Sequence, residues 1–69
     1  MLNFIELHTV GEAGEIVTGI NFDMVTAFCK LDSGRTRIFY TNLQHDDVTE
    51  DYETVWRLVA ETKYVYSKI

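Results

Sequence analysis

The sequence predicts an α+β fold, in which a four-stranded antiparallel sheet of two hairpins is followed by one C-terminal amphipathic helix packed on one face. Four segments alternate apolar and polar residues with the two-residue period of a half-buried strand. Turn-forming residues separate these segments, and the last segment changes to the helical period of 3.6 residues. Strands are expected near 3–9, 15–21, 24–31 and 36–41, and the helix near 50–63.

The first hairpin is predicted from alternation on both sides of a glycine cluster. Apolar residues alternate with polar ones before Gly11 and again after Gly14. Glycine suits such a turn because it adopts backbone conformations that other residues avoid. Closing this hairpin symmetrically places four aliphatic residues on one face of the sheet: Ile5, Leu7, Ile16 and Ile20.

The second hairpin is predicted from the turn sequence that begins at Asp32 and contains Gly34. Closing the turn around Ser33 and Gly34 places Cys29 opposite Ile38. The same register places Phe28 opposite Phe39, on the other face. Cys29 is then expected to face the helix as a small buried hydrophobic residue.

The helix is predicted from four residues that recur at the spacing of one helical face: Tyr52, Val55, Trp56 and Val59. Either Thr49 or Asp51 can cap its N-terminus. Residues 64–66 are β-branched and aromatic, so they fit either a continuation of the helix or a short extended arm.

Length and composition predict a single domain that spans residues 1–69. Cys29 is the only cysteine, so no disulfide can form within one chain, and the cysteine usage indicates a reducing compartment. No signal peptide and no apolar segment long enough to cross a bilayer are found, so a cytoplasmic location is expected. The net charge of −5 disfavours nucleic acid and anionic membranes as partners.

One helix covers only one face of a four-stranded sheet, so the other face is expected to stay uncovered. The predicted registers place four large apolar residues on it, which form the candidate interface: Phe4, Val17, Phe28 and Phe39. An apolar patch of this kind usually marks an interface, here with a second copy or with another protein. The alternative is a strongly curled sheet that encloses these residues in its own core.

Signals for chemistry are weak. His45, Asp46 and Asp47 form the only cluster with metal-ligand side chains, but adjacent loop residues diverge and no second ligand pair follows. The cluster is interpreted as an acidic loop before the helix, and metal binding there remains open. Cys29 has no predicted histidine neighbour, and no glycine-rich phosphate loop occurs. We expect no catalytic residues, no cofactor and no enzymatic activity.

The first functional hypothesis is therefore a non-catalytic interaction or oligomerisation module that acts through the uncovered aromatic face. The second is related to nucleic acid. In one form, Phe28 and Phe39 would stack on single-stranded bases beside Lys30 and Arg37. In the other form, the acidic chain would mimic DNA and occupy a DNA-binding protein.

The order of the segments also resembles a known group of proteins. The stretches 4–8, 14–17, 20–23, 25–28, 37–40 and 48–55 look like those of short uncharacterised bacterial and phage proteins. More loosely, they are similar to the small flagellar-operon family linked to swarming motility. The resemblance covers most of the chain and rests on apolar pattern and helix-start residues, so it implies a fold and no active residues.

Overall fold

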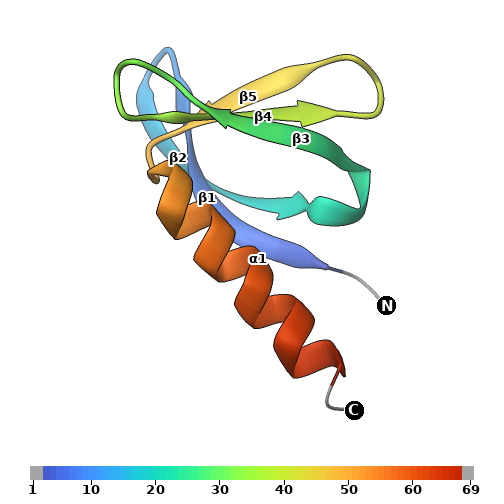
Figure 1. Cartoon of the computed structure of the whole chain (residues 1–69). Helices are drawn as coiled ribbons and strands as arrows, with labels where there is room; N and C mark the ends of the chain where they lie inside the picture. Colours follow the sequence, from blue (N-terminus) through green and yellow to red (C-terminus); the bar gives the residue numbers. More distant parts are fainter. Residues whose placement is uncertain (1–2, 68–69) are drawn as a thin grey trace.

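The computed structural model describes the backbone of residues 3–67 and the side chains of residues 3–62. It is an α+β structure with a five-stranded antiparallel sheet and one C-terminal helix (Figure 1). The elements are β1 (Phe4–Gly11), β2 (Gly14–Asn21), the short 3-10 helix η1 (Phe22–Met24), β3 (Val25–Lys30), β4 (Thr36–Tyr40), β5 (His45–Val48) and α1 (Tyr52–Ser67).

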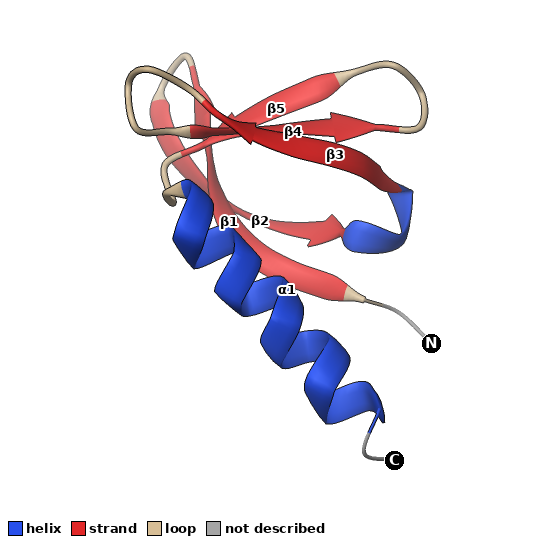
Figure 2. Ribbon diagram, in the orientation of Figure 1, coloured by secondary structure: helices blue, strands red, loops and turns tan. Residues whose placement is uncertain are grey.

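The prediction of four strands is wrong, because His45–Val48 forms a fifth strand in the middle of the sheet. The strand order is β2-β1-β5-β4-β3, so β5 joins the two predicted hairpins. It pairs with β4 over four residues and with β1 at a single pair, Thr9 with Val48. The sheet curls, and β1 and β2 bend towards the helix (Figure 2).

β5 escaped prediction because its sequence is polar, and aspartate is uncommon in strands. In the structure, both aspartates have partners on β4. Arg37 donates from Nε and Nη2 to the carboxylate of Asp47 at 2.8 and 3.1 Å. The Tyr40 hydroxyl donates to Asp46 at 2.9 Å. These cross-strand contacts, together with the burial of Val48, stabilise a strand that its own propensity does not favour.

The core lies between one side of the sheet and the helix; we call this side of the sheet the core side and the opposite side the outer side. The buried apolar side chains among the described residues are Ile5, Leu7, Ile20, Ile38, Val48, Val55 and Val59. Ile16 and Cys29, which the sequence places on the covered face, are exposed instead. Ile16 shares the core side with Leu7 but lies near the hairpin tip, beyond the buried part of the sheet.

The register of the second hairpin differs from the predicted one by one residue. Leu31 and Arg35 close a three-residue loop, in which Gly34 has a φ of 91°. Phe28 therefore pairs with Ile38, and Phe39 pairs with Ala27. A shift of one residue moves a side chain to the other face of a strand. Consequently Phe28 points to the core side, and Cys29 points to the outer side.

The helix begins where the sequence predicts and extends further than predicted. Asp51 is its N-cap, because the Asp51 carboxylate accepts a hydrogen bond from the Thr54 amide at 2.8 Å. This contact lowers the pKa of Asp51. The helical backbone continues to Ser67, so residues 64–66 extend the helix, while 68 and 69 lie outside the described residues. No helix in the described part of the chain is long and apolar enough to cross a membrane.

Candidate interaction surface

Three of the four predicted interface residues are exposed on the outer side of the sheet, and one is not. Phe4 is 52% exposed, Val17 is 61% exposed and Phe39 is 36% exposed. Phe28, on the core side, packs against Tyr52 and Trp56 of α1, with ring centroids 5.5 and 5.3 Å away. The predicted placement of Phe28 on the uncovered face is therefore wrong, because the hairpin register reverses it.

The three exposed residues do not form one patch. β1 runs parallel to β4, with β5 between them, and the ladder aligns Thr9, Val48 and Thr36 in one row. Phe4 lies five residues before this row along β1, whereas Phe39 lies three residues beyond it along β4. At roughly 3.3 Å per residue, they are on the order of 26 Å apart along the strands. Phe4 and Val17 belong to the β1–β2 hairpin and Phe39 to the other half of the sheet.

The free edge of β2 is open in the described part of the chain, where no other strand pairs with it. The amide of Phe22 donates to the carbonyl of Asn3 at 2.9 Å, which makes this pair hydrogen-bonded. Hydrogen-bonded and non-hydrogen-bonded pairs alternate along an antiparallel ladder. Ile5 and Ile20, two positions further along, are therefore also a hydrogen-bonded pair. In the non-hydrogen-bonded pairs, the N–H and C=O groups of the β2 residue point away from β1, to the free edge. Four residues of β2 belong to such pairs: Glu15, Val17, Gly19 and Asn21.

A contact on the other side of β1 supports this parity. His8 pairs with Val17, and its carbonyl accepts a hydrogen bond from the Thr49 amide at 2.9 Å. The His8 backbone thus points away from β2. Because the two members of a non-hydrogen-bonded pair both point outward, the backbone of Val17 points away from β1, to the free edge.

β2 lacks the usual protection of an edge strand. Natural edges are interrupted by proline, lysine or a bulge, which prevent pairing with another chain. β2 contains none of these: all eight of its residues pair with β1 in one register, and Glu15 is its only charged residue. Ile16 and Val17 are 54% and 61% exposed. The edge is therefore a long, regular and apolar template for another strand.

Gly19 leaves a gap on the outer side of this edge. A Cβ atom at Gly19 would meet only Cδ1 of Phe4, at 3.8 Å. The Phe4 ring, which is 52% exposed, lies beside this gap. Glycine inside a strand often marks a place where another backbone approaches closely. The β2 edge patch consists of the four residues whose backbone groups point to the free edge, together with the neighbouring Phe4: Phe4, Glu15, Val17, Gly19 and Asn21.

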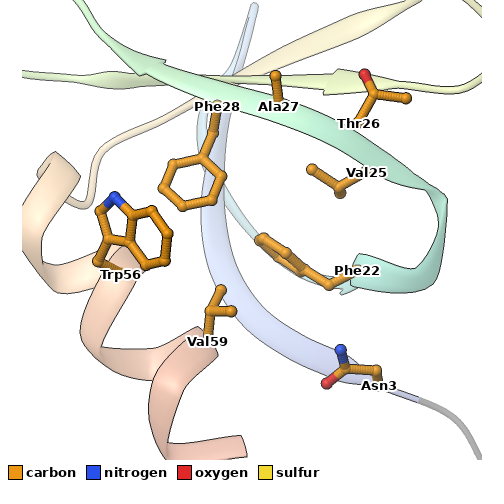
Figure 3. A pocket seen from close by; sticks show the side chains of 8 residues that line it. All are labelled: Asn3, Phe22, Val25, Thr26, Ala27, Phe28, Trp56 and Val59. Atoms are coloured by element: carbon orange, nitrogen blue, oxygen red, sulfur yellow. The ribbon is translucent and has the colours of Figure 1, made fainter. Parts of the chain in front are cut away.

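The other edge of the sheet, β3, is better protected. β3 has six residues, its register shifts between Val25 and Ala27, and Lys30 ends it. Beside it lies a pocket of about 170 Å³ between β3, η1 and the helix (Figure 3). Phe22, Phe28 and Trp56 supply its aromatic lining. The bulge and the terminal lysine oppose pairing along β3, so its edge is a poorer template than that of β2.

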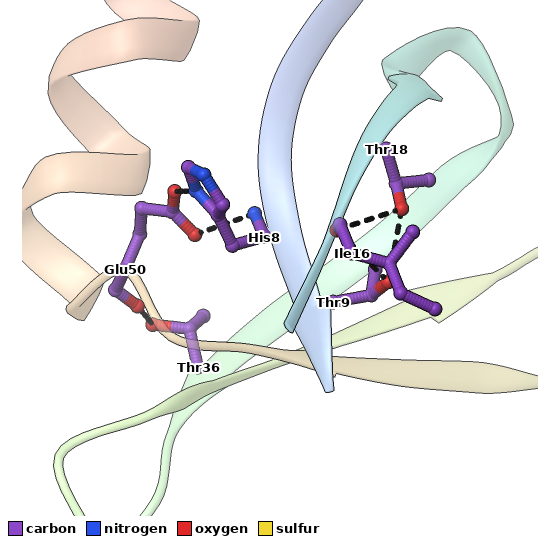
Figure 4. A network of polar contacts seen from close by, with 6 residues as sticks. All are labelled: His8, Thr9, Ile16, Thr18, Thr36 and Glu50. Carbon is purple, nitrogen blue, oxygen red and sulfur yellow. Dashed lines mark hydrogen bonds and ion pairs between the residues drawn. The ribbon is translucent and has the colours of Figure 1, made fainter. Parts of the chain in front are cut away.

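A polar network connects the start of the helix to β1 (Figure 4). The carboxylate of Glu50 contacts His8 Nδ1 at 2.7 Å and accepts the His8 backbone N–H at 3.0 Å. The Glu50 carbonyl accepts a hydrogen bond from the hydroxyl of Thr36, which is fully buried, at 2.9 Å. Glu50 thus provides a hydrogen-bond acceptor for the His8 N–H of β1, at a point where the short strand β5 has already ended.

This network shifts the pKa of both ionisable groups. The hydrogen bond to Glu50 raises the pKa of His8. Burial alone would raise the pKa of Glu50, but the hydrogen bonds from His8 outweigh it and lower the pKa of the carboxyl group. Both shifts favour the charged pair. The arrangement is explained by its role in holding the helix to the sheet.

The structure separates the remaining groups that could carry chemistry. Cys29 is exposed on the outer side of β3, while His8 is on β1, with two strands between them. His45 and Asp47 point to one side of β5 and Asp46 points to the other, and each aspartate already has a partner on β4. Among the described residues, no group of three histidine, cysteine or acidic side chains could hold a metal ion.

Two features of the surface escaped the sequence reasoning. One is the open edge of β2, for which Gly19 within an alternating strand is the only sequence signal, because such a glycine often marks a close backbone approach. The exposure of Trp56, which is 51% exposed beside the pocket, was also missed. Its helical spacing places it beside the core, but the curled sheet leaves that flank of the helix open. Helical periodicity alone does not show how far a sheet extends over a helix.

Comparison with protein-family models, with curated proteins and with solved structures finds no match to this chain. The resemblance to small bacterial and phage proteins and to the swarming-motility family therefore stays a prediction.

Proposed function

We propose that the chain is a non-catalytic protein-binding module that receives an extended polypeptide segment along the free edge of β2. The incoming segment would add a sixth strand to the sheet, and its outer side chains would pack on Phe4 and Val17. The observation that carries this proposal is the uninterrupted pairing of β2 with β1, which leaves four outward-facing residues aligned on an exposed edge. Strand addition of this kind takes its affinity from main-chain hydrogen bonds.

The nucleic-acid hypothesis has less support from the geometry. It requires Phe28 and Phe39 to form one stacking platform, but they lie on opposite sides of the sheet. Lys30 pairs with Thr36 and not with Arg37, whose guanidinium is bound to Asp47. The net charge of −5 adds general repulsion from phosphates. Because Cys29 is an exposed free thiol, we also propose a reducing, cytoplasmic location.

The proposal is tested by photo-crosslinking in the cells that produce the protein. A benzophenone amino acid at Val17 should form covalent adducts with a protein partner, whereas the same group at Glu53, on the exposed face of α1, should not. Adding Gly19→Pro to the Val17 variant should abolish the adducts, because proline removes an outward N–H while leaving the pairing with β1 intact. Equal crosslinking from both sites, or adducts insensitive to Gly19→Pro, would refute a binding site at this edge.

A further inference from the structure

We propose that the segment received by β2 is β2 of a second copy of this chain, in antiparallel pairing about a two-fold axis at Thr18. This inference rests on the proposed function and names its partner. The sheets of the two copies would join into one continuous sheet through their unprotected edges. The edge of β2 is self-complementary in its backbone hydrogen-bonding groups, its outer side chains and its charges.

The backbone allows only a few two-fold registers. In a hydrogen-bonded pair between the two edges, the backbone groups of both residues must point to the free edge. Each such pair therefore combines two of the residues 15, 17, 19 and 21. A two-fold axis at Thr18 uses the whole set: residue 15 faces 21, and 17 faces 19. An axis at Val17 or at Gly19 leaves an outward-facing residue at one end without a partner. The register centred on Thr18 therefore forms the most main-chain hydrogen bonds.

The same register fits the side chains on the outer side. It places Val17 of one copy opposite Gly19 of the other, where the missing side chain leaves the Phe4 ring accessible. The valine would lie in this gap beside the ring, and the two-fold axis repeats the contact. Phe4 and Val17, now 52% and 61% exposed, would both lose contact with water. The axis at Val17 lacks this fit, since it places the two valines side by side.

Charges are compatible with this pairing. Glu15, the only charged residue of β2, faces Asn21 of the other copy, whose amide can donate a hydrogen bond to a carboxylate. No like charges stand directly opposite each other, an arrangement that destabilises paired strands. The general repulsion between two copies of net charge −5 is screened by salt. A small domain of this size also gains stability by oligomerising.

The first experiment is sedimentation of the full chain in moderate salt at about 100 µM, where a dissociation constant near 10 µM gives mostly dimer. We expect a dimer for the wild type and a monomer for Gly19→Pro, with the same circular dichroism spectrum. A monomeric wild type would overturn pairing between copies. It would leave strand addition with another protein standing, because the crosslinking experiment at Val17 tests that separately.

The second experiment tests the register by disulfide formation, with Cys29→Ser as the background. Thr18→Cys places two thiols across the two-fold axis, at a non-hydrogen-bonded pair with Cα atoms about 4.5 Å apart, within the range that a disulfide bridges. Ile16→Cys is the matched control, because its two thiols would lie about four residues apart along the ladder, or roughly 13 Å. Mild oxidation should link the Thr18 variant rapidly and the Ile16 variant only slowly. The reverse order would overturn the register.

Discussion

The two halves of the sheet solve the problem of an exposed edge in different ways. The β3–β4–β5 half is short and has a register shift near one end, and polar pairs hold its strands together: Arg37 with Asp47, and Tyr40 with Asp46. The β1–β2 half is longer and regular, and it leaves its outer edge apolar and unblocked. The two halves share one ladder pair, Thr9 with Val48, and are bridged by Glu50.

This difference identifies β2 as the edge that is open to the strand addition proposed above. An edge that is bulged and ends in a lysine is protected against pairing, whereas an apolar edge without a bulge invites it. The half that holds β3 keeps Phe28 against the helix, although Phe39 on its outer side is 36% exposed. The half that holds β2 presents Phe4 and Val17 to solvent beside Gly19. In the proposed function, the exposed Phe4 and Val17 contact the partner, whereas the packed Phe28 stabilises the fold.

The largest expected change in stability comes from a comparison of two variants, each of which places a charge on one side of the β3–β4 hairpin. Phe28→Asp should unfold the protein, because it removes an aromatic side chain from the core side and buries a carboxylate there; the cost is at least about 3 kcal/mol. Phe39→Asp should cost less than about 1 kcal/mol, since the position faces outward. Thermal unfolding followed by circular dichroism measures both changes.

A conservative pair of variants serves as the control for this comparison. Phe28→Leu should fold with reduced stability, and Phe39→Leu should be close to the wild type. If Phe39→Asp were the more damaging of the two aspartate variants, the register that places Phe28 opposite Ile38 would be wrong. The three-residue loop that ends at Gly34 would then be wrong as well, because loop length and register are linked.

The fold could be predicted in outline because alternation and helical spacing report local structure directly. The strands before Gly11 and after Gly14, and the buried positions Val55 and Val59 of the helix, follow from such patterns. The strand β5 could not be predicted, since His45–Val48 has little strand propensity and is stabilised by partners on another strand. Contacts that are distant in sequence leave no local signal.

The candidate surface was predicted only in part, and for a specific reason. Phe4 and Val17 are exposed as expected, because the symmetric closure of the first hairpin is correct. In the second hairpin, closure around Ser33 and Gly34 predicts a loop of two residues, but the loop has three. Phe28 and Cys29 therefore face the sides opposite to those predicted. Turn length decides which side of a strand every residue faces, so a small local error becomes a large error in the surface.

The second largest expected changes in stability come from substitutions in the turns of the two halves. Gly14 has a φ of 113° in the β1–β2 turn, and Leu43 has a φ of 69° in the β4–β5 turn. Gly14→Ala should destabilise the protein by about 1–2 kcal/mol, because alanine is strained at positive φ. Leu43→Gly should stabilise it by about 0.5–1 kcal/mol, since Leu43 is 95% exposed and loses no packing. Changes of the same sign in chemical denaturation would contradict this contrast.

The smallest expected effect concerns pH and distinguishes the polar contacts of the two halves. The pKa of His8 is raised from its ordinary value of 6.5, so its contribution is complete below that pH and is lost as pH rises through the folded-state value. The pKa of Glu50 is lowered from 4.5, so its contribution is present above that pH and is lost as pH falls through the folded-state value. The pair therefore stabilises most between pH 4.5 and 6.5.

Melting temperatures of the wild type and of His8→Gln should accordingly differ most near pH 5.5 and converge towards pH 8.5. Asp47→Asn is the matched control in the other half. The hydrogen bond from Arg37 lowers the pKa of Asp47 from 3.8, and the same contact raises the pKa of Arg37 above its usual range, so neither group titrates in this range. The deficit of Asp47→Asn should therefore be constant with pH. If the deficit of His8→Gln were equally constant, the contact of His8 with Glu50 would act through hydrogen bonding alone, and charge would add nothing to the attachment of the helix to β1.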